Sequence, residues 1–182
     1  MILGLIPARL NSTRLKDKPL LIIDGLPMIV HSFKRAMLSK KLDDIIVCTD
    51  DKEIIDVVRN NGGKAVLTSK KHKNGTERIY EVAKKKKAEL IISIQGDEPL
   101  VDPKAIDKVI DFHRKNKHFD IVTPCIPTKE YIDNRNLVKV IFSDKGKIIY
   151  FTRAKAPYDF KNKGLKYFKH LPIMSFLPSA LK

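Results

Sequence analysis

The stretch Ile2-Leu-Gly-Leu-Ile6 is followed by Pro7-Ala-Arg-Leu-Asn-Ser-Thr-Arg-Leu-Lys-Asp-Lys-Pro-Leu20, so a short apolar run leads directly into a loop rich in cations. An apolar run of this length that ends at a loop is typical of a buried strand. The opening residues lack the basic start and the small-residue cleavage site of a secretory leader. We therefore interpret them as the first strand of the fold.

Beyond this strand, short apolar runs alternate with amphipathic stretches, a pattern typical of a mostly parallel sheet covered by helices. The runs predicted to be strands are Ile2–Ile6, Ile45–Cys48, Ala65–Leu67 and Leu90–Ile94. The stretches predicted to be helices are Met28–Leu38, Glu53–Asn61, Glu77–Lys87 and Pro103–Lys115. The predicted fold class is α/β, with a Rossmann-like sheet.

The last quarter of the chain departs from this alternation. Two apolar runs, Val138–Phe142 and Lys147–Phe151, are joined by Ser143-Asp-Lys-Gly146 and predict an inserted β-hairpin. Leu171–Phe176 is predicted to be another strand, and from Pro178 the chain has the pattern of a first helical turn. We expect such an unfinished helix to bury nothing. We therefore predict a single domain, residues 1–182, whose C-terminal part is missing.

The composition is typical of a folded protein in aqueous solution, with 43% hydrophobic and 31% charged residues. No apolar run approaches the roughly 18 residues needed to span a bilayer, so no membrane contact is predicted. Cys48 and Cys125 each lie in an apolar stretch, which indicates reduced thiols in the core and a cytoplasmic location.

The formal net charge of +15 raises the alternative of a nucleic-acid-binding protein. Most of the 36 basic residues are lysines spread along the chain, and Trp is absent. Nucleic-acid readers usually concentrate arginine and interleave aromatic residues. We therefore predict solvated basic surfaces that attract a small polyanion, with no nucleic-acid partner.

Cations gather in the loop after the first predicted strand, at Arg9, Arg14 and Lys18. Ligands of open α/β sheets bind at the carboxyl edge of the strands, where this loop begins. Several cations there can neutralise a triphosphate, and each arginine fork fits two phosphate oxygens at once. From charge alone, the alternative is a basic loop in solvent.

A second motif, Gln95-Gly-Asp-Glu-Pro99, directly follows the predicted strand Leu90–Ile94. A carboxylate at the end of a strand suits Mg²⁺, which takes one or two protein carboxylates and completes its shell with water and phosphate oxygens. Gly96 is expected to let the backbone approach a ligand closely. We predict Asp97 as the metal ligand, with an ordinary acidic turn as the alternative.

Five motifs between Leu5 and about His170 give the chain a resemblance to the CMP-Kdo synthetases, the 3-deoxy-manno-octulosonate cytidylyltransferases. They are the first loop, Asn74-Gly-Thr-Glu-Arg78, Gln95-Gly-Asp-Glu-Pro99, Asn136-Leu-Val-Lys-Val140 and Phe151-Thr-Arg-Ala-Lys-Ala-Pro-Tyr-Asp159. The resemblance implies a nucleotidyltransferase domain in which the anomeric hydroxyl of the acidic sugar Kdo attacks the α-phosphorus of CTP and expels pyrophosphate. In the family this reaction serves lipopolysaccharide or capsule synthesis.

The resemblance also implies roles for individual residues. Asp97 would hold Mg²⁺ against the phosphates, while Arg9, Arg14 and Lys18 stabilise the charge on the leaving group. The residues implied in nucleotide binding are Ala8, Arg9, Arg14, Lys18, His72, Gly75, Thr76 and Arg78. Those implied to face the sugar are Gln95, Arg153 and His170, with Arg153 as the partner of its carboxylate. The alternatives are an ordinary loop residue for His72 and surface or packing residues for Arg153 and His170.

The chain departs from the family pattern at a few positions. Lys16-Asp17 stands where the family usually has Pro-Gly, so a positive φ required there would fall on an aspartate. Pro172 and Met174 replace a glycine and a tyrosine, which puts sugar contacts there in doubt. The resemblance implies a homodimer, although much of the family's dimer surface and a further metal-binding aspartate lie beyond residue 182.

Three alternatives to the Kdo enzyme stay open at this point. One is a cytidylyltransferase for another acidic sugar, such as amino-Kdo or a sialic-acid-like acid. Another is a catalytically dead fragment that binds nucleotide. The third is the nucleic-acid-binding protein suggested by net charge alone.

Overall fold

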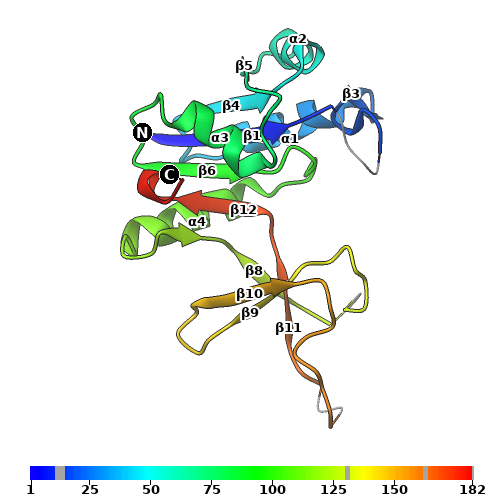
Figure 1. The fold of residues 1–182 in the computed structure, drawn as a ribbon, viewed down its shortest axis with the longest axis vertical. Coiled ribbons are helices and arrows are strands. Elements are labelled where there is room, and N and C mark those ends of the chain that lie inside the picture. The colour runs from blue at the N-terminus through cyan, green and yellow to red at the C-terminus, as the bar shows by residue number, and fades with distance from the viewer. Residues whose placement is uncertain (11–14, 130–131, 162–163, 182) are drawn as a thin grey trace. The chain divides into compact units, whose positions relative to one another are not determined.

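A computed structural model describes residues 1–10, 15–129, 132–161 and 164–181 of the chain. The chain separates into two compact units, a larger one formed by Met1–Val122 and Pro172–Lys182 and a smaller one formed by Thr123–Leu171. Each unit has its own sheet and is described by itself (Figure 1). With this division, the single domain spanning residues 1–182 stays a prediction.

The larger unit contains a six-stranded sheet in the order β5-β4-β1-β6-β12-β7. The first four strands in this order are parallel to one another, whereas β12 is antiparallel to both of its neighbours. The strands are β1 (Ile2–Ala8), β4 (Asp44–Thr49), β5 (Ala65–Leu67), β6 (Leu90–Ile94), β7 (Ile121–Val122) and β12 (Ile173–Phe176). The predicted α/β class with a mostly parallel sheet is therefore confirmed.

Four helices cover the two faces of this sheet. They are α1 (Met28–Met37), α2 (Lys52–Asn60), α3 (Gly75–Ala83) and α4 (Pro103–Lys115). Successive side chains of a strand point to opposite faces. Along β1, Ile2 and Ile6 accordingly pack with α1, α2 and α4, whereas Leu3 and Leu5 pack with α3. Helix α3 thus covers the face opposite to α1 (Figure 1).

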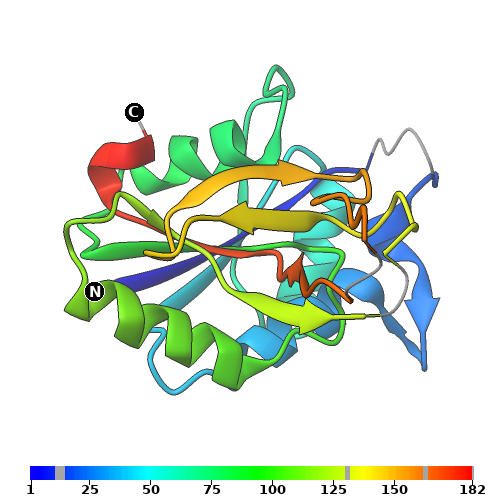
Figure 2. The same ribbon diagram turned by 90° about the horizontal axis from the view of Figure 1, so that it is seen from below.

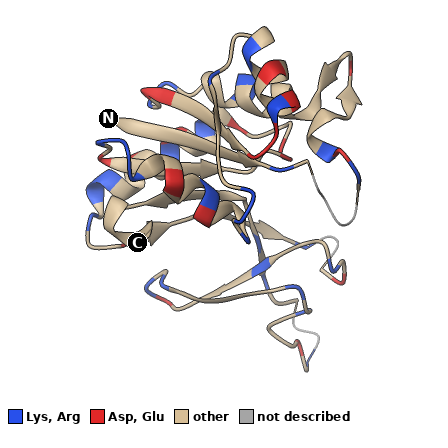
Figure 3. Ribbon diagram, turned by 45° about the horizontal axis from the view of Figure 1, so that its top comes forward, with Lys and Arg blue, Asp and Glu red and all other residues tan. Residues whose placement is uncertain are grey.

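Helix α3 differs at both ends from the predicted helix Glu77–Lys87. It begins at Gly75 because Asn74 caps it: the Asn74 side chain accepts from the Glu77 N–H at 2.9 Å, and the Glu77 carboxylate accepts from the Asn74 amide. It ends at Ala83 because the chain must soon enter β6, where the Glu89 N–H donates to the Met1 carbonyl. The lysine run 84–87 lies outside the helix and is exposed, as expected for solvated cations. Figure 3 shows acidic and basic positions interspersed on α2 and α3.

The smaller unit contains a four-stranded antiparallel sheet in the order β10-β9-β11-β8 (Figure 2). The strands are β8 (Cys125–Thr128), β9 (Lys139–Phe142), β10 (Ile148–Thr152) and β11 (Tyr167–His170). Strands β9 and β10 form the predicted hairpin, with an irregularity in register between Ile148 and Tyr150. The turn between them closes through a hydrogen bond from the Gly146 N–H to the Ser143 carbonyl, with φ of +74° at Gly146. Sequence analysis missed β8 and β11, which are short and mix polar with apolar residues.

Two 3₁₀ helices and a two-stranded ribbon complete the described structure. The 3₁₀ helix η1 (Lys18–Leu20) forms the end of the first motif, and the two-stranded ribbon of β2 (Ile22–Ile23) and β3 (Leu26–Pro27) follows it. The chain closes on the 3₁₀ helix η2 (Pro178–Leu181). Leu181 is only 6% exposed and packs in the cluster under α3, so the expectation that this segment buries nothing was wrong. A single turn is enough to bring one leucine onto that face.

The two cysteines differ in their surroundings. Cys48 is fully buried in β4, and burial raises the pKa of its thiol to about 12. Cys125 at the start of β8 is half-buried, with a pKa also raised by burial. The prediction of a core thiol is therefore confirmed for Cys48 but overstates the burial of Cys125. None of the helices in the described ranges has the length and apolar character needed to cross a bilayer.

Candidate active site

Three sequence motifs meet at Pro7, near the carboxyl end of β1. A Cβ added to Gly96 would lie 2.9 Å from the carbonyl oxygen of Pro7, and one added to Gly75 would lie 3.1 Å from its Cγ. Glycine at these positions lets the turn after β6 and the start of α3 pack directly on the end of β1. The close approach of a ligand to Gly96 stays a prediction, and the close approach that the structure shows there is to Pro7 of β1.

Lys18 and Asp97 join the first loop to the turn after β6. The Lys18 Nζ lies 2.6 Å from the Asp97 Oδ2. The side chains are 34% and 49% exposed, so the ion pair contributes little to stability. Its importance is geometric, because two motifs separated by 79 positions place a cation and a carboxylate side by side at the carboxyl edge of the sheet.

The backbone of Asp17 has the left-handed conformation, with φ of 52° and ψ of 26°. Aspartate tolerates this region better than most residues other than glycine. The Asp17 carbonyl accepts from the Leu20 N–H at 2.8 Å and so closes the turn that carries Lys18. The position at which the family pattern has glycine therefore does require a positive φ, and here an aspartate adopts it.

Helix α1 supports the turn after β6 from inside the protein. The buried Ser32 hydroxyl donates to the Gly96 carbonyl at 2.9 Å, and the Arg35 Nε donates to the Val101 carbonyl at 3.2 Å. Sequence analysis missed both residues. The signal available for Ser32 was a hydroxyl on the face of the predicted helix Met28–Leu38 that also carries Ile29 and Phe33.

Arg78 lies beneath the loop that carries His72. Its guanidinium donates to the Asp50 carboxylate at 2.8 Å and to the Thr68 hydroxyl at 2.6 Å, and the residue is only 3% exposed. Sequence analysis placed Arg78 among the nucleotide contacts. The geometry instead directs its guanidinium into the protein, because a buried cation needs an ionic partner and Asp50 provides one. Arg78 therefore supports the loop from below.

His72 is tied to α3 through Glu81. The Glu81 carboxylate accepts from the Ser69 N–H at 2.9 Å and lies 2.6 Å from the His72 Nε2. The Ser69 N–H, followed by His72, holds the pKa of Glu81 below its usual range. The carboxylate is therefore ionised at neutral pH, and His72 Nε2 acts as the donor in this pair. His72 is thus a fixed part of the loop between β5 and α3.

The other predicted nucleotide residues lie around the same edge of the larger unit. Ala8 is buried at the end of β1, and Arg9 follows it with an exposed side chain. Gly75 and Thr76 form the first turn of α3. Arg14 lies outside the described residues.

The predicted sugar-facing residues belong to both units. Gln95 directly follows β6 in the larger unit and is half-buried. In the smaller unit, Arg153 is exposed and its Nη1 donates to the Arg135 carbonyl at 2.9 Å. His170 is half-buried, with its Nε2 2.8 Å from the Thr123 hydroxyl, and burial lowers its pKa. The imidazole is therefore neutral at pH 7.

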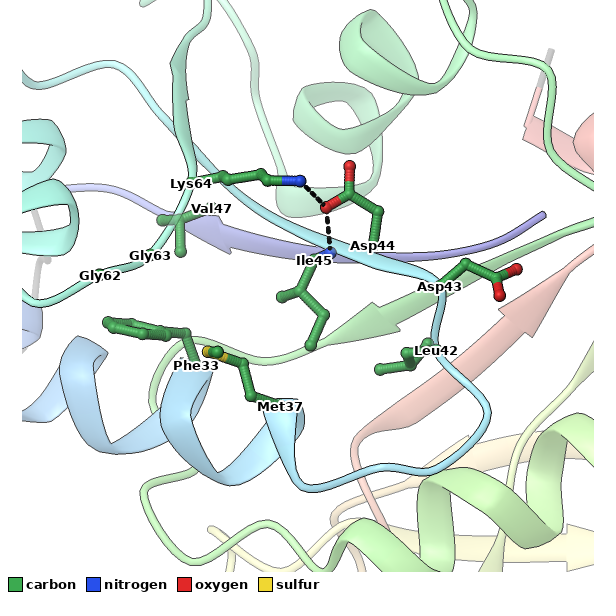
Figure 4. A pocket seen from close by; sticks show the side chains of 10 residues that line it. All are labelled: Phe33, Met37, Leu42, Asp43, Asp44, Ile45, Val47, Gly62, Gly63 and Lys64. Carbon is green, nitrogen blue, oxygen red and sulfur yellow. Dashed lines mark hydrogen bonds and ion pairs between the residues drawn. The ribbon is translucent and has the colours of Figure 1, made fainter.

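A separate pocket lies at the amino end of β4 (Figure 4). Its volume is about 250 Å³, and Phe33 and Met37 of α1 form part of its lining. The Lys64 Nζ reaches the Asp44 carboxylate there at 2.6 Å. None of the predicted site residues lines this pocket, and its volume is below the roughly 300–1,000 Å³ usual for small-molecule sites. We therefore place the candidate active site at the opposite, carboxyl edge.

The donor set at this edge suits one kind of metal ion. Within the described ranges, no group of three or more His, Cys, Asp or Glu residues is arranged to hold a metal. Asp97 is a half-exposed carboxylate that accepts a hydrogen bond from the Lys18 ammonium group. It fits Mg²⁺, which needs only one or two protein carboxylates when phosphates complete its shell.

The fold and this edge, with its carboxylate, its cations and the capped start of α3, define the class of nucleotidyltransferases. Residues 3–177 match the model of the cytidylyltransferase family. The chain belongs to that family.

Curated relatives of this chain carry two related names. The 3-deoxy-manno-octulosonate cytidylyltransferase of Fusobacterium nucleatum is 46% identical over 177 residues, which cover 96% of this chain and 72% of the relative. The enzyme of the same name from Leptospira biflexa is 43% identical over 178 residues, with the same coverage of 96% and 72%. An 8-amino-3,8-dideoxy-manno-octulosonate cytidylyltransferase from Shewanella putrefaciens is 40% identical over 181 residues, covering 96% of this chain and 74% of the relative.

Solved structures agree with the fold. A CMP:2-keto-3-deoxy-manno-octonic acid synthetase complexed with CTP superposes with a TM-score of 0.93 at 33% identity, covering 99% of this chain and 75% of the other. A 4-diphosphocytidyl-2C-methyl-D-erythritol synthase from Anaerococcus prevotii has a TM-score of 0.62 at 17% identity, which shows a shared fold only.

Proposed function

We propose that the protein transfers CMP from CTP to the anomeric hydroxyl of Kdo and releases pyrophosphate. The observation that supports the proposal is the Lys18–Asp97 pair, in which a cation suited to phosphate lies beside a carboxylate suited to Mg²⁺ in the turn after β6. The names of the curated relatives and the CTP complex of the similar solved structure support this choice of substrates.

In this reaction the sugar hydroxyl oxygen attacks the α-phosphorus of CTP and loses its proton. The bond from the α-phosphorus to the bridging oxygen breaks, and that oxygen leaves with pyrophosphate. Arg9, Arg14 and Lys18 would bind the triphosphate and neutralise the charge that develops on the leaving group. No covalent intermediate on the protein is needed, because positioning and electrostatic stabilisation are sufficient for this chemistry.

Asp97 would hold Mg²⁺ between the protein and the phosphates. The ion, when bound, supplies positive charge to the phosphate oxygens. Lys18 would then exchange its contact with Asp97 for the phosphate oxygens. The support for this role is the half-exposed carboxylate at the carboxyl edge of a parallel strand.

The nucleotide would be held by the loop between β5 and α3 and by the end of β1. His72, Gly75 and Thr76 are the proposed contacts on one side, with Ala8 and Arg9 on the other. Arg78 is proposed to act indirectly, since its guanidinium holds Asp50 and Thr68 beneath the loop.

The sugar would be recognised through its carboxylate and hydroxyl groups. Arg153 has an exposed guanidinium suited to a carboxylate, and His170 is a neutral donor or acceptor. Gln95 would contribute an amide from the end of β6. The proposal includes a place in lipopolysaccharide or capsule synthesis and a homodimer, as the family resemblance implies. It also includes a cytoplasmic location, which is inferred from the reduced thiols of Cys48 and Cys125.

A second candidate substrate is 8-amino-Kdo. The 40% identity to a relative named for that substrate is close to the identity with the Kdo enzymes. Both sugars share the carboxylate that Arg153 would bind, so the choice between them falls on residues that contact position 8.

The proposal is tested by following pyrophosphate release from CTP with Kdo, 8-amino-Kdo or a sialic acid, with and without Mg²⁺. We expect turnover with Kdo that depends on Mg²⁺ and is lost when UTP replaces CTP. Turnover with 8-amino-Kdo alone would transfer the assignment to that sugar. Absence of turnover with every acidic sugar, in a chain that unfolds cooperatively, would contradict the proposal.

A further inference from the structure

Lys139 in β9 has no exposed surface, although lysine is among the residues least often fully buried. Its Nζ donates to the main-chain carbonyl of Arg153 at 2.8 Å and lies 3.4 Å from that of Asn134. Burial lowers the pKa of the ammonium group, and the nearby charge of Arg153 lowers it further, against the opposing effect of Asp133. The smaller unit thus encloses a cation whose hydrogen bonds end on backbone carbonyls.

These hydrogen bonds fix the backbone on which Arg153 stands. Thr152, the last residue of β10, is paired with Lys139 in the antiparallel ladder, and Arg153 follows it immediately. The guanidinium of Arg153 in turn donates to the Arg135 carbonyl at 2.9 Å. The backbone of Arg153 and its side chain are therefore attached to the same loop, at Asn134 and Arg135, with Lys139 as the central donor.

Packing alone does not explain a lysine at this position. Enclosing an ammonium group costs desolvation, and an apolar side chain of similar length would fill the space without that cost. What the ammonium group adds is a set of directed hydrogen bonds to the Arg153 and Asn134 carbonyls.

We propose that Lys139 is a positioning residue for the transfer reaction: it holds the backbone at Arg153 so that the Arg153 guanidinium is set to receive the carboxylate of the acidic sugar. This inference rests on the proposed function. Lys139 would affect the affinity for the sugar through Arg153. The affinity for CTP would depend on the larger unit and would not change.

The chain offers a matched control in Lys169 of β11. It is the residue directly paired with Lys139 across the sheet, but its side chain is exposed. Lys169→Met removes the same charge from the neighbouring strand without touching the Arg153 carbonyl. An effect of net charge on the attraction of an acidic sugar would appear in both variants, whereas positioning of Arg153 depends on Lys139 alone.

The experiment is a double-mutant cycle with Lys139→Met, Arg153→Ala and the double variant, with Lys169→Met as control. Steady-state rates are measured against the acidic sugar that the wild type uses and, separately, against CTP. We expect Lys139→Met to raise the KM for the sugar by about tenfold, the order of effect of a lost hydrogen bond to a charged group, with the KM for CTP unchanged. In the Arg153→Ala background the same substitution should have almost no further effect, since it acts through Arg153. Lys169→Met should match the wild type.

If Lys139→Met raised the KM for the sugar by the same factor in the wild-type and Arg153→Ala backgrounds, Lys139 would act independently of Arg153. That result would overturn the inference. A loss of unfolding stability with both KM values unchanged would also overturn it and leave a structural role. If Lys139→Met does not fold, Lys139→Gln, which keeps a donor group, takes its place in the cycle with the same expected non-additivity. If the folded wild type used no acidic sugar, both proposals would be overturned. If the wild type turned over and Lys139→Met left the KM for the sugar unchanged, only the positioning role of Lys139 would be overturned.

Discussion

The two units of the protein differ in what lies at their centres. The larger unit is built on β1, whose seven residues are all buried, with apolar clusters on both faces of the sheet. In the described part of the smaller unit, the buried residues are Lys139, Val140 and Tyr167. One of these is a charged lysine, and another, Tyr167, has a buried hydroxyl for which the described residues provide no hydrogen-bond partner.

Stability and recognition are divided between the two units. Burial of apolar area is the main source of folding free energy, so the larger unit contributes most of the stability. The smaller unit has little apolar burial and exposes large side chains such as Tyr158 and Phe160, at 78% and 81%. Its polar centre serves to direct particular groups. We therefore expect substitutions in the larger unit to affect folding and turnover, and those in the smaller unit to affect chiefly the use of the sugar.

The largest effect is expected from the core of the larger unit. Phe33 of α1 is 2% exposed in the main apolar cluster, and Phe33→Ala should lower the free energy of unfolding by about 3–5 kcal/mol. Val140→Ala in the smaller unit should cost only about 1–2 kcal/mol. Urea unfolding followed by circular dichroism measures both. Equal costs would show that the two cores are equally stabilising.

The next largest effect concerns turnover at the larger unit's edge. Asp97→Asn keeps the shape of the side chain but removes the charge proposed to hold Mg²⁺, so kcat should fall by about 100-fold or more. Asp102→Asn is the matched control, because Asp102 caps α4 and asparagine caps a helix equally well. Pyrophosphate release at limiting Mg²⁺ measures both variants. Turnover of Asp97→Asn near that of Asp102→Asn would remove Asp97 from the metal site.

A smaller effect is expected from alanine substitutions at Gly96 and Gly146, which should differ in their effect on turnover. Gly96→Ala places a Cβ 2.9 Å from the Pro7 carbonyl oxygen, so the turn after β6 must shift, at a cost of roughly 1–3 kcal/mol and with a loss of turnover. Gly146→Ala in the hairpin meets no atom within 4 Å but strains a backbone with φ of +74°, at roughly 1–2 kcal/mol.

Thermal unfolding and steady-state assays of these two glycine variants separate stability from activity. We expect similar losses of stability but a loss of turnover only in Gly96→Ala. If Gly146→Ala reduced turnover as much as Gly96→Ala does, the hairpin of the smaller unit would contribute to catalysis.

The smallest effect is a difference between the units in their response to acid. Burial depresses the pKa of His170 below its ordinary 6.5, so this residue contributes stability that is present above pH 6.5 and is lost as the pH falls through the lowered value. Hydrogen bonds depress the pKa of Glu81 below 4.5, so its contribution is present above pH 4.5 and is lost only in more acidic solution. The smaller unit should therefore loosen first, as the pH falls below 6.5.

Hydrogen exchange at pH 7, 5 and 4, corrected for the intrinsic exchange rate, measures this order. His170→Gln should remove the early loss of protection in β8 and β11, since glutamine does not titrate. If the larger unit lost protection from hydrogen exchange at a higher pH than the smaller one, His170 would not be the group that sets the order of loosening.

Much of the larger unit could be predicted because its signals are local. The strands β5 and β6 and helix α4 have the predicted bounds, since each is a short apolar run or an amphipathic stretch flanked by turn residues. Both chemical motifs were also found, because cations and carboxylates that follow buried strands stand out in the sequence. The smaller unit gave weaker signals: its hairpin was predicted from its turn, whereas β8 and β11 have neither clear alternation nor an apolar run.

The fold class, the hairpin, the cation loop and the Asp97 turn can be predicted from the sequence, because periodicity, turn chemistry and charge are properties of neighbouring residues. Four contacts become visible only in the folded chain: Lys18 with Asp97, Gly96 with Pro7, Arg78 with Asp50, and Lys139 with the Arg153 carbonyl. Each of these depends on contacts between residues far apart in the chain. A charged side chain in a sequence shows only its type. Burial of the charged group costs desolvation free energy, which a ligand, an ion partner or a backbone carbonyl can compensate. The fold determines which of these partners lies close enough to do so.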